Sequence, residues 1–79
     1  MNVLFFGIAR DIVGTSELLI SDLVNKPTVN DLKEYLMARY SEFSKLTSFA
    51  VAVNNEYAKD NVPLDQNDEI AIIPPVSGG

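Results

Sequence analysis

The sequence predicts an α+β domain in which one main helix packs across a mixed sheet of four to five strands. Two observations carry this prediction. Short apolar segments rich in β-branched and aromatic residues recur along the chain, and a single segment has its apolar residues at helical spacing. The 79 residues are enough for one domain. A ferredoxin-like fold would need a second full helix, which the short polar segment 41–48 does not supply.

The start of the chain is predicted to form two paired strands. Asn2–Ala9 is apolar in both phases of its alternation, with Phe6 on the opposite phase from Phe5. The segment 10–16, which contains Gly14, is interpreted as a turn. Glu17–Leu23 is then the second strand, so that the two strands form a hairpin.

The main helix is predicted over Val29–Arg39. Thr28 is a favourable N-cap residue, and Asp31 follows three positions later, where a capping box places its acidic residue. The apolar positions then recur at helical spacing, at Val29, Leu32, Leu36 and Tyr40. The segment 41–48 is expected to be a loop with at most a short helical turn.

The remaining strands complete the predicted sheet. Phe49–Val53 is a strand, Asn54-Asn55 is a turn pair, and a short strand follows at Tyr57-Ala58. Asp60–Asp68 is expected to be a loop, and Glu69–Ile73 is the final strand. This order of elements is typical of the β-grasp, the ubiquitin-like fold. We therefore predict a β-grasp domain over residues 1–73 and an extended tail over 74–79.

One helix can cover only one face of such a sheet. The first and last strands are nevertheless apolar on both faces, with Phe6 and Ile73 among the residues left without cover. An exposed apolar patch of this kind usually marks a partner surface. The alternative is that the loop Asp60–Asp68 folds over the second face.

Composition excludes several classes of function. Eleven acidic and six basic residues give a net charge of −5, which disfavours nucleic acid and favours either a basic partner surface or simple solubility. Cysteine and histidine are absent, so disulfides, common zinc sites and the usual nucleophile–base pairs are excluded. No apolar run approaches a membrane span, and the N-terminus does not resemble a signal peptide. We expect a cytoplasmic protein.

The tail is built as a narrow extension. Pro74 and Pro75 cannot donate ladder hydrogen bonds, so the sheet is predicted to stop at Pro74 and the chain to leave it extended. Six residues from Pro74 onward can reach about 20 Å. Gly78 and Gly79 have no side chains and fit a channel too narrow for other residues. The functional group is then the carboxylate of Gly79, which a partner enzyme would have to activate.

Three segments resemble one known family. They are Val3-Leu4-Phe5-Phe6-Gly7 with Arg10 and Gly14, then Ala52-Val53-Asn54, and finally Asp68-Glu69-Ile70-Ala71-Ile72-Ile73-Pro74-Pro75-Val76-Ser77-Gly78-Gly79. Together they resemble the small subunit of molybdopterin synthase, a ubiquitin-like sulfur carrier. The resemblance runs from the first strand to the last residue and is weak only over about 41–48.

The resemblance implies a role in molybdenum cofactor biosynthesis. An activating enzyme that consumes ATP would adenylate Gly79, and a sulfur donor would convert it to a thiocarboxylate (1-thioglycine). The thiocarboxylate would then donate sulfur to cyclic pyranopterin monophosphate within the large subunit, in an assembly of two small and two large subunits. The chain would bind no cofactor and would be a sulfur-donor subunit, with the active site on the large subunit.

The resemblance also assigns residues to roles. Gly79 carries the sulfur, and the residues that thread into the partner's channel are Pro75, Val76, Ser77 and Gly78. The residues that contact the partner are Phe6, Arg10, Tyr57 and Ile73. Many family tails have threonine where this chain has Ser77, and serine keeps the hydroxyl group.

Two other functions share the same tail chemistry. One is the sulfur carrier of thiamine biosynthesis, whose chains are generally shorter and lack the proline pair before the tail. The other is a ubiquitin-like protein modifier, which would use the same activation step but form isopeptide bonds with lysines.

Overall fold

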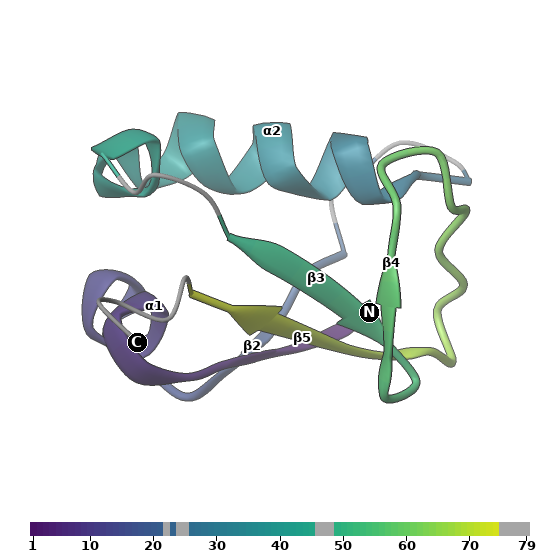
Figure 1. Cartoon of the computed structure of the whole chain (residues 1–79), viewed down its shortest axis with the longest axis horizontal. Helices are drawn as coiled ribbons and strands as arrows, with labels where there is room; N and C mark the ends of the chain where they lie inside the picture. The colour runs from purple at the N-terminus through teal and green to yellow at the C-terminus, as the bar shows by residue number, and fades with distance from the viewer. Residues whose placement is uncertain (22, 24–25, 46–48, 75–79) are drawn as a thin grey trace.

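The structure is a computed structural model that describes residues 1–21, 23, 26–45 and 49–74. These residues form a five-stranded sheet with one long helix across one of its faces (Figure 1). The elements in chain order are β1 (Asn2–Phe5), α1 (Gly7–Val13), β2 (Glu17–Leu19), α2 (Val29–Arg39), the 3-10 helix η1 (Ser41–Lys45), β3 (Ala50–Val53), β4 (Glu56–Ala58) and β5 (Glu69–Ile73).

The first and last strands lie side by side at the centre of the sheet. The strand order is β2-β1-β5-β3-β4, in which β1 and β5 are parallel and every other neighbouring pair is antiparallel. Phe5 pairs with Ile72, and Ile73 pairs with Ala50 on β3. This is the predicted β-grasp arrangement, and it brings the last residues of β5 next to the end of β1.

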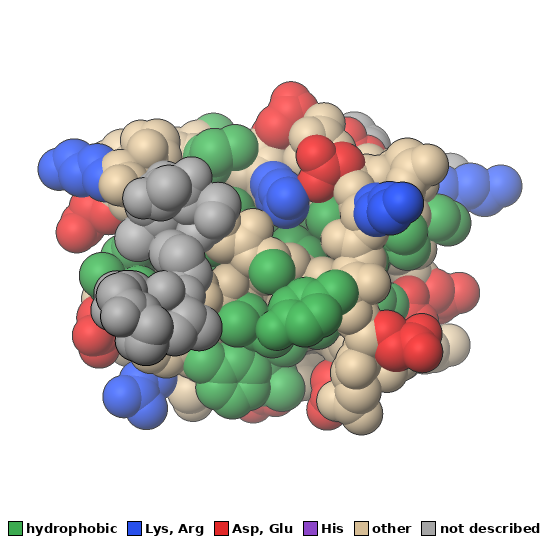
Figure 2. Space-filling view, in the orientation of Figure 1, with side chains coloured by type: hydrophobic (Ala, Val, Ile, Leu, Met, Phe, Trp, Pro, Cys, Tyr) green, Lys and Arg blue, Asp and Glu red, His purple; other side chains and the backbone are tan. Residues whose placement is uncertain are grey.

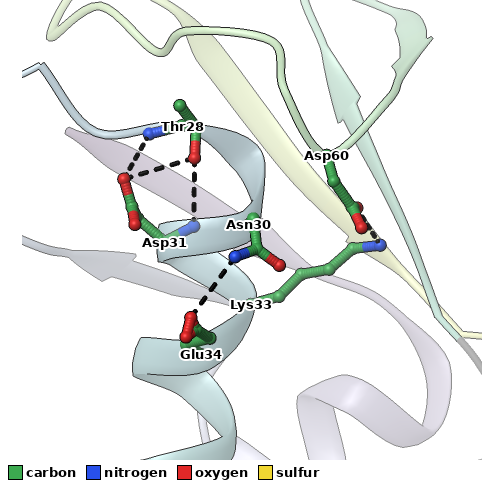
Figure 3. A network of polar contacts seen from close by, with 6 residues as sticks. All are labelled: Thr28, Asn30, Asp31, Lys33, Glu34 and Asp60. Atoms are coloured by element: carbon green, nitrogen blue, oxygen red, sulfur yellow. Dashed lines mark hydrogen bonds and ion pairs between the residues drawn. The ribbon is translucent and has the colours of Figure 1, made fainter.

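The main helix α2 begins and ends where the sequence predicts. The Thr28 hydroxyl accepts a hydrogen bond from the Asp31 N–H at 3.3 Å, and the Asp31 carboxylate accepts one from the Thr28 N–H at 2.8 Å (Figure 3). This reciprocal capping box satisfies two backbone donors that the first helical turn leaves unpaired. Val29, Leu32 and Leu36 are buried beneath the helix.

The loop between β4 and β5 packs against the start of α2. The Val29 N–H donates to the Val62 carbonyl at 2.9 Å, and the Leu64 N–H donates to the Pro27 carbonyl at 2.8 Å. An ion pair of 2.8 Å between Lys33 and Asp60 joins the helix to this loop at the surface (Figure 3), where such pairs add little stability. The alternative prediction, that this loop covers the second face of the sheet, is therefore wrong.

The hydrophobic core lies between the sheet and α2, with α1, η1 and the β4–β5 loop closing its ends. Buried side chains come from three of the strands, from the helices α1, α2 and η1, and from two of the connecting segments. They are Val3, Phe5, Ala9, Ile20, Val29, Leu32, Leu36, Phe43, Val51, Leu64, Ile70 and Ile72.

The prediction of one strand over Asn2–Ala9 followed by a turn is wrong. The strand ends at Phe5, and Gly7–Val13 forms the helix α1. The backbone leaves the strand at Gly7, which has φ +55°, and the helix ends at Gly14, which has φ +90° and whose N–H donates to the Arg10 carbonyl at 2.8 Å. Seven residues are too few to form a helix alone, so packing of the buried Ala9 against the core holds it.

Other differences from the prediction are small. The second strand ends at Leu19 instead of Leu23, and β3 begins one residue after Phe49. The expected short helical turn after α2 is η1, whose Phe43 is buried. The Asn54-Asn55 turn is confirmed, since both residues have positive φ, of 53° and 70°. Among the described residues, none of the helices is both long and apolar enough to cross a membrane.

Candidate functional site

The face of the sheet opposite α2 carries a row of four residues that crosses four strands. Leu4 on β1 pairs with Ala71 on β5, Ala71 pairs with Ala52 on β3, and Ala52 pairs with Tyr57 on β4. The two small side chains therefore lie between two large ones. Because directly paired residues on one face are close neighbours, this order of sizes leaves a hollow above the alanines.

The hollow is a groove of about 430 Å³. Its floor is Ala71 and Ala52, with Leu4 and Tyr57 on opposite sides. The full set of residues around it is Leu4, Phe6, Ala52, Asn55, Tyr57, Glu69, Ala71 and Ile73. We call this feature the sheet groove. Figure 2 shows hydrophobic side chains gathered over β5, on the side of the sheet away from α2.

Two aromatic side chains of the sheet groove are unusually exposed. Tyr57 is 75% exposed and Phe6 is 50% exposed, although large apolar side chains are normally buried in a folded domain. The residues around the groove include no lysine or arginine, and Glu69 is the one carboxylate. The groove is therefore an apolar surface with a single acidic side chain, as a partner surface would be.

The base of the tail lies at one end of the sheet groove. Ile73 borders the groove and is the last residue of β5, so Pro74 follows it directly. The predicted end of the sheet at Pro74 is confirmed, because the β3–β5 and β1–β5 pairings stop at Ile73 and Ile72. A chain that continues beyond Pro74 thus starts beside the groove.

A second hollow, of about 460 Å³, lies elsewhere on the molecule. It is bordered by Met1, Ile20, Pro27, Leu64 and neighbouring polar residues. Since β1 and β5 are parallel, Met1 lies at the end of the sheet where β5 begins, away from Pro74. This second hollow therefore lies away from the start of the tail, and its lining is partly polar, so we do not assign it to the functional site.

The structure brings together three of the four residues predicted to contact a partner. Phe6, Tyr57 and Ile73 all border the sheet groove, whereas Arg10 does not. Arg10 is an exposed residue of α1, and within the described chain its side chain makes no hydrogen bond or ion pair. The tail residues Pro75, Val76, Ser77, Gly78 and Gly79 lie outside the described residues.

Sequence reasoning missed the middle of the sheet groove. Ala52 and Ala71 were not identified as site residues, because a small side chain gives no signal of its own. Leu4 shares the strand phase of Phe6, and Ala71 shares that of Ile73, so alternation alone could have placed them on the same face. The described part of the chain has no cluster of three or more acidic, cysteine or histidine side chains that could hold a metal ion.

Comparisons with known proteins agree with this description. A model of the ThiS family matches residues 3–79. The molybdopterin synthase sulfur carrier subunit of Drosophila erecta is 35% identical over 82 residues, which cover 100% of this chain and 90% of that protein.

Solved structures of similar shape come from archaea and bacteria. A putative molybdopterin converting factor, subunit 1, from Pyrococcus furiosus has a TM-score of 0.85, with 26% identity and 95% of both chains covered. The small archaeal modifier protein 1 of Methanosarcina acetivorans has a TM-score of 0.78, with 26% identity over 99% of this chain and 94% of that one. A chain in the complex of subunits 1 and 2 of molybdopterin-converting factor from Helicobacter pylori has a TM-score of 0.65, with 26% identity over 99% and 96%.

The sheet topology and the apolar groove beside the last strand define a ubiquitin-like β-grasp protein. Since the family model spans almost the whole sequence, the chain belongs to the ThiS family.

Proposed function

We propose that this chain is the sulfur carrier subunit of a molybdopterin synthase, with the carboxylate of Gly79 as its reactive group. The observation that carries the proposal is the position of Ile73, which borders the sheet groove and directly precedes the tail. A partner held at the groove would therefore lie next to the start of the tail. The likeness to molybdopterin synthase sulfur carrier subunits supports the same assignment.

The proposed chemistry takes place on the tail and is catalysed by partners. A carboxylate is a poor electrophile, and transfer of AMP from ATP converts it to an acyl-adenylate with release of pyrophosphate. A sulfur donor then displaces AMP and leaves a thiocarboxylate on Gly79. Its sulfur attacks a carbon of the pyranopterin substrate and displaces an oxygen substituent from that carbon, which leaves with the bonding electrons. Water then hydrolyses the bond between the Gly79 acyl carbon and the sulfur, so that the sulfur stays on the substrate and the carboxylate is restored. The chain itself needs no nucleophilic side chain, in keeping with its lack of cysteine.

The sheet groove is proposed to bind the large subunit. Tyr57 and Phe6 are exposed aromatic side chains, the type that most often dominates binding energy at an interface. The complex of subunits 1 and 2 from H. pylori, which contains a chain of this fold, supports a large-subunit partner. The two-plus-two assembly, the contact of Arg10 with the partner, the threading of Pro75 to Gly78 and the cytoplasmic location remain predictions.

Deletion of Gly79 tests the proposal. The full chain and the deletion variant are incubated with the activating enzyme, ATP, a sulfur source, the large subunit and the pyranopterin substrate. The strand pairing ends at Ile73, before the tail begins, so both proteins should show the same unfolding curve, while only the full chain should form molybdopterin. A deletion variant that still supports product formation would contradict the role of the Gly79 carboxylate. A deletion variant that unfolds more readily would contradict a tail that is separate from the folded domain.

A second candidate function is covalent protein modification, which the likeness to a small archaeal modifier protein favours. Activation of Gly79 is common to both functions, and they differ in the acceptor, which is a lysine amine for a modifier. Purification of a tagged chain under denaturing conditions separates them. A modifier gives a series of covalent adducts with other proteins, and a dedicated sulfur carrier gives the free chain alone.

A further inference from the structure

Two glycines with left-handed backbone conformations stand at the two ends of α1. Gly7 has φ +55° and Gly14 has φ +90°, so a side chain would be strained at either position. Their surroundings differ. A Cβ atom at Gly14 would meet nothing within 4 Å, whereas a Cβ atom at Gly7 would lie 3.3 Å from Cγ of Pro74.

Gly7 and Pro74 face each other where β1 and β5 separate. Phe5 pairs with Ile72 in parallel register, and two further residues along each chain lead to Gly7 and Pro74. Pro74 has no N–H to donate, and the pairing of β5 has ended at Ile73. Pro74 is the last described residue, and its ring lies beside the backbone of Gly7.

We infer that Gly7 is a positioning residue for sulfur transfer. The missing side chain lets the ring of Pro74 lie against the backbone at the start of α1, and this contact sets the direction of the chain toward Gly79. The inference rests on the proposed function. The tail from Pro74 can reach about 20 Å, so a small rotation at its base displaces its tip by a larger distance. Misplacement of a reacting group by about 1 Å can lower a rate about 100-fold.

The two glycines provide a matched pair of variants, Gly7→Ala and Gly14→Ala. Both place a side chain on a left-handed residue at an end of α1, but only Gly7→Ala brings a side chain against Pro74. Each variant is loaded with sulfur and mixed with the large subunit and the pyranopterin substrate, and kcat and KM are measured with the loaded variant as the varied substrate. The urea midpoint of unfolding is measured separately for each variant. We expect both variants to have lowered midpoints. Gly7→Ala should lower kcat about tenfold or more, and Gly14→Ala should stay within about twofold of the unaltered chain.

A third variant tests the contact itself. Pro74→Ala removes the Cγ atom that the new methyl group would approach, so Gly7→Ala should lower kcat less in that background than in the unaltered chain. The inference is overturned if the two glycine variants have equal kcat, if the loss is the same with or without the proline ring, or if Gly7→Ala raises only KM. A change in KM alone would indicate that the substitution weakens binding at the sheet groove, through the neighbouring Phe6, and does not displace the tail. The unaltered chain separates a failure of this inference from a failure of the proposed function. If the unaltered chain transfers no sulfur, the proposed function is wrong; if it transfers sulfur but the variants behave as just described, only the role of Gly7 is wrong.

Discussion

Single residues on the uncovered face of the sheet differ sharply in their surroundings. Tyr57 on β4 and Leu19 on β2 are almost equally exposed, at 75% and 74%, yet only Tyr57 borders the sheet groove. Strand alternation predicted that Phe6 and Ile73 lie on an uncovered face. Strand alternation could not predict the sheet groove, because the floor of the groove depends on the β3–β5 register, which pairs Ala52 with Ala71.

Tyr57 and Leu19 therefore form a controlled test of the groove as the binding site. We expect Tyr57→Ala to weaken binding to the large subunit about tenfold or more, or about 1.4 kcal/mol, because an aromatic anchor is lost. Leu19→Ala should change the dissociation constant by less than about threefold, since it removes a similarly exposed side chain outside the groove. Titration calorimetry measures both constants. Equal losses for the two variants would indicate that exposed apolar area in general, and not the groove, drives binding.

At the scale of elements, the two helices show what local sequence can and cannot predict. For α2 the cap at Thr28, the acidic residue at Asp31 and the apolar spacing all indicate a helix with the observed bounds. In α1 the β-branched Ile8 extended the apolar run of β1 and favoured a longer strand, and Gly14 favoured a turn over 10–16. The signals for a helix were weaker: the spacing of Ala9 and Ile12, and a glycine at the C-terminal cap. Tertiary packing decided the outcome there.

The capping box of α2 gives a prediction about stability. Thr28→Ala removes the hydroxyl that accepts the Asp31 N–H, so it should lower the free energy of unfolding by about 1 kcal/mol. For a domain of this size that corresponds to a loss of about 4–8 °C in Tm. Asn30→Ala, two residues away, loses only an exposed hydrogen bond of 3.3 Å to Glu34 and should change the free energy by less than about 0.5 kcal/mol. Thermal unfolding followed by circular dichroism checks both, and equal Tm values for the two variants would refute a capping role.

At the scale of the whole molecule, the parallel pairing of the first and last strands determines where function can lie. It places Phe6, after β1, and Ile73, at the end of β5, at the same end of one sheet face, beside the start of the tail. The order of predicted elements was sufficient to infer the β-grasp. The sequence also indicated the tail chemistry, through the proline pair and the final glycines. The extra helix and the groove floor required the three-dimensional structure, because they depend on contacts between distant segments.

The most direct test of the account is the intact mass of the protein after incubation with the activating enzyme, ATP and a sulfur source. We predict a mass gain equal to the replacement of one oxygen atom by sulfur, and fragmentation should place the gain on Gly79. Omission of ATP should abolish it, because the carboxylate must first be adenylated. A chain of unchanged mass, or a sulfur atom located on any other residue, would contradict the account.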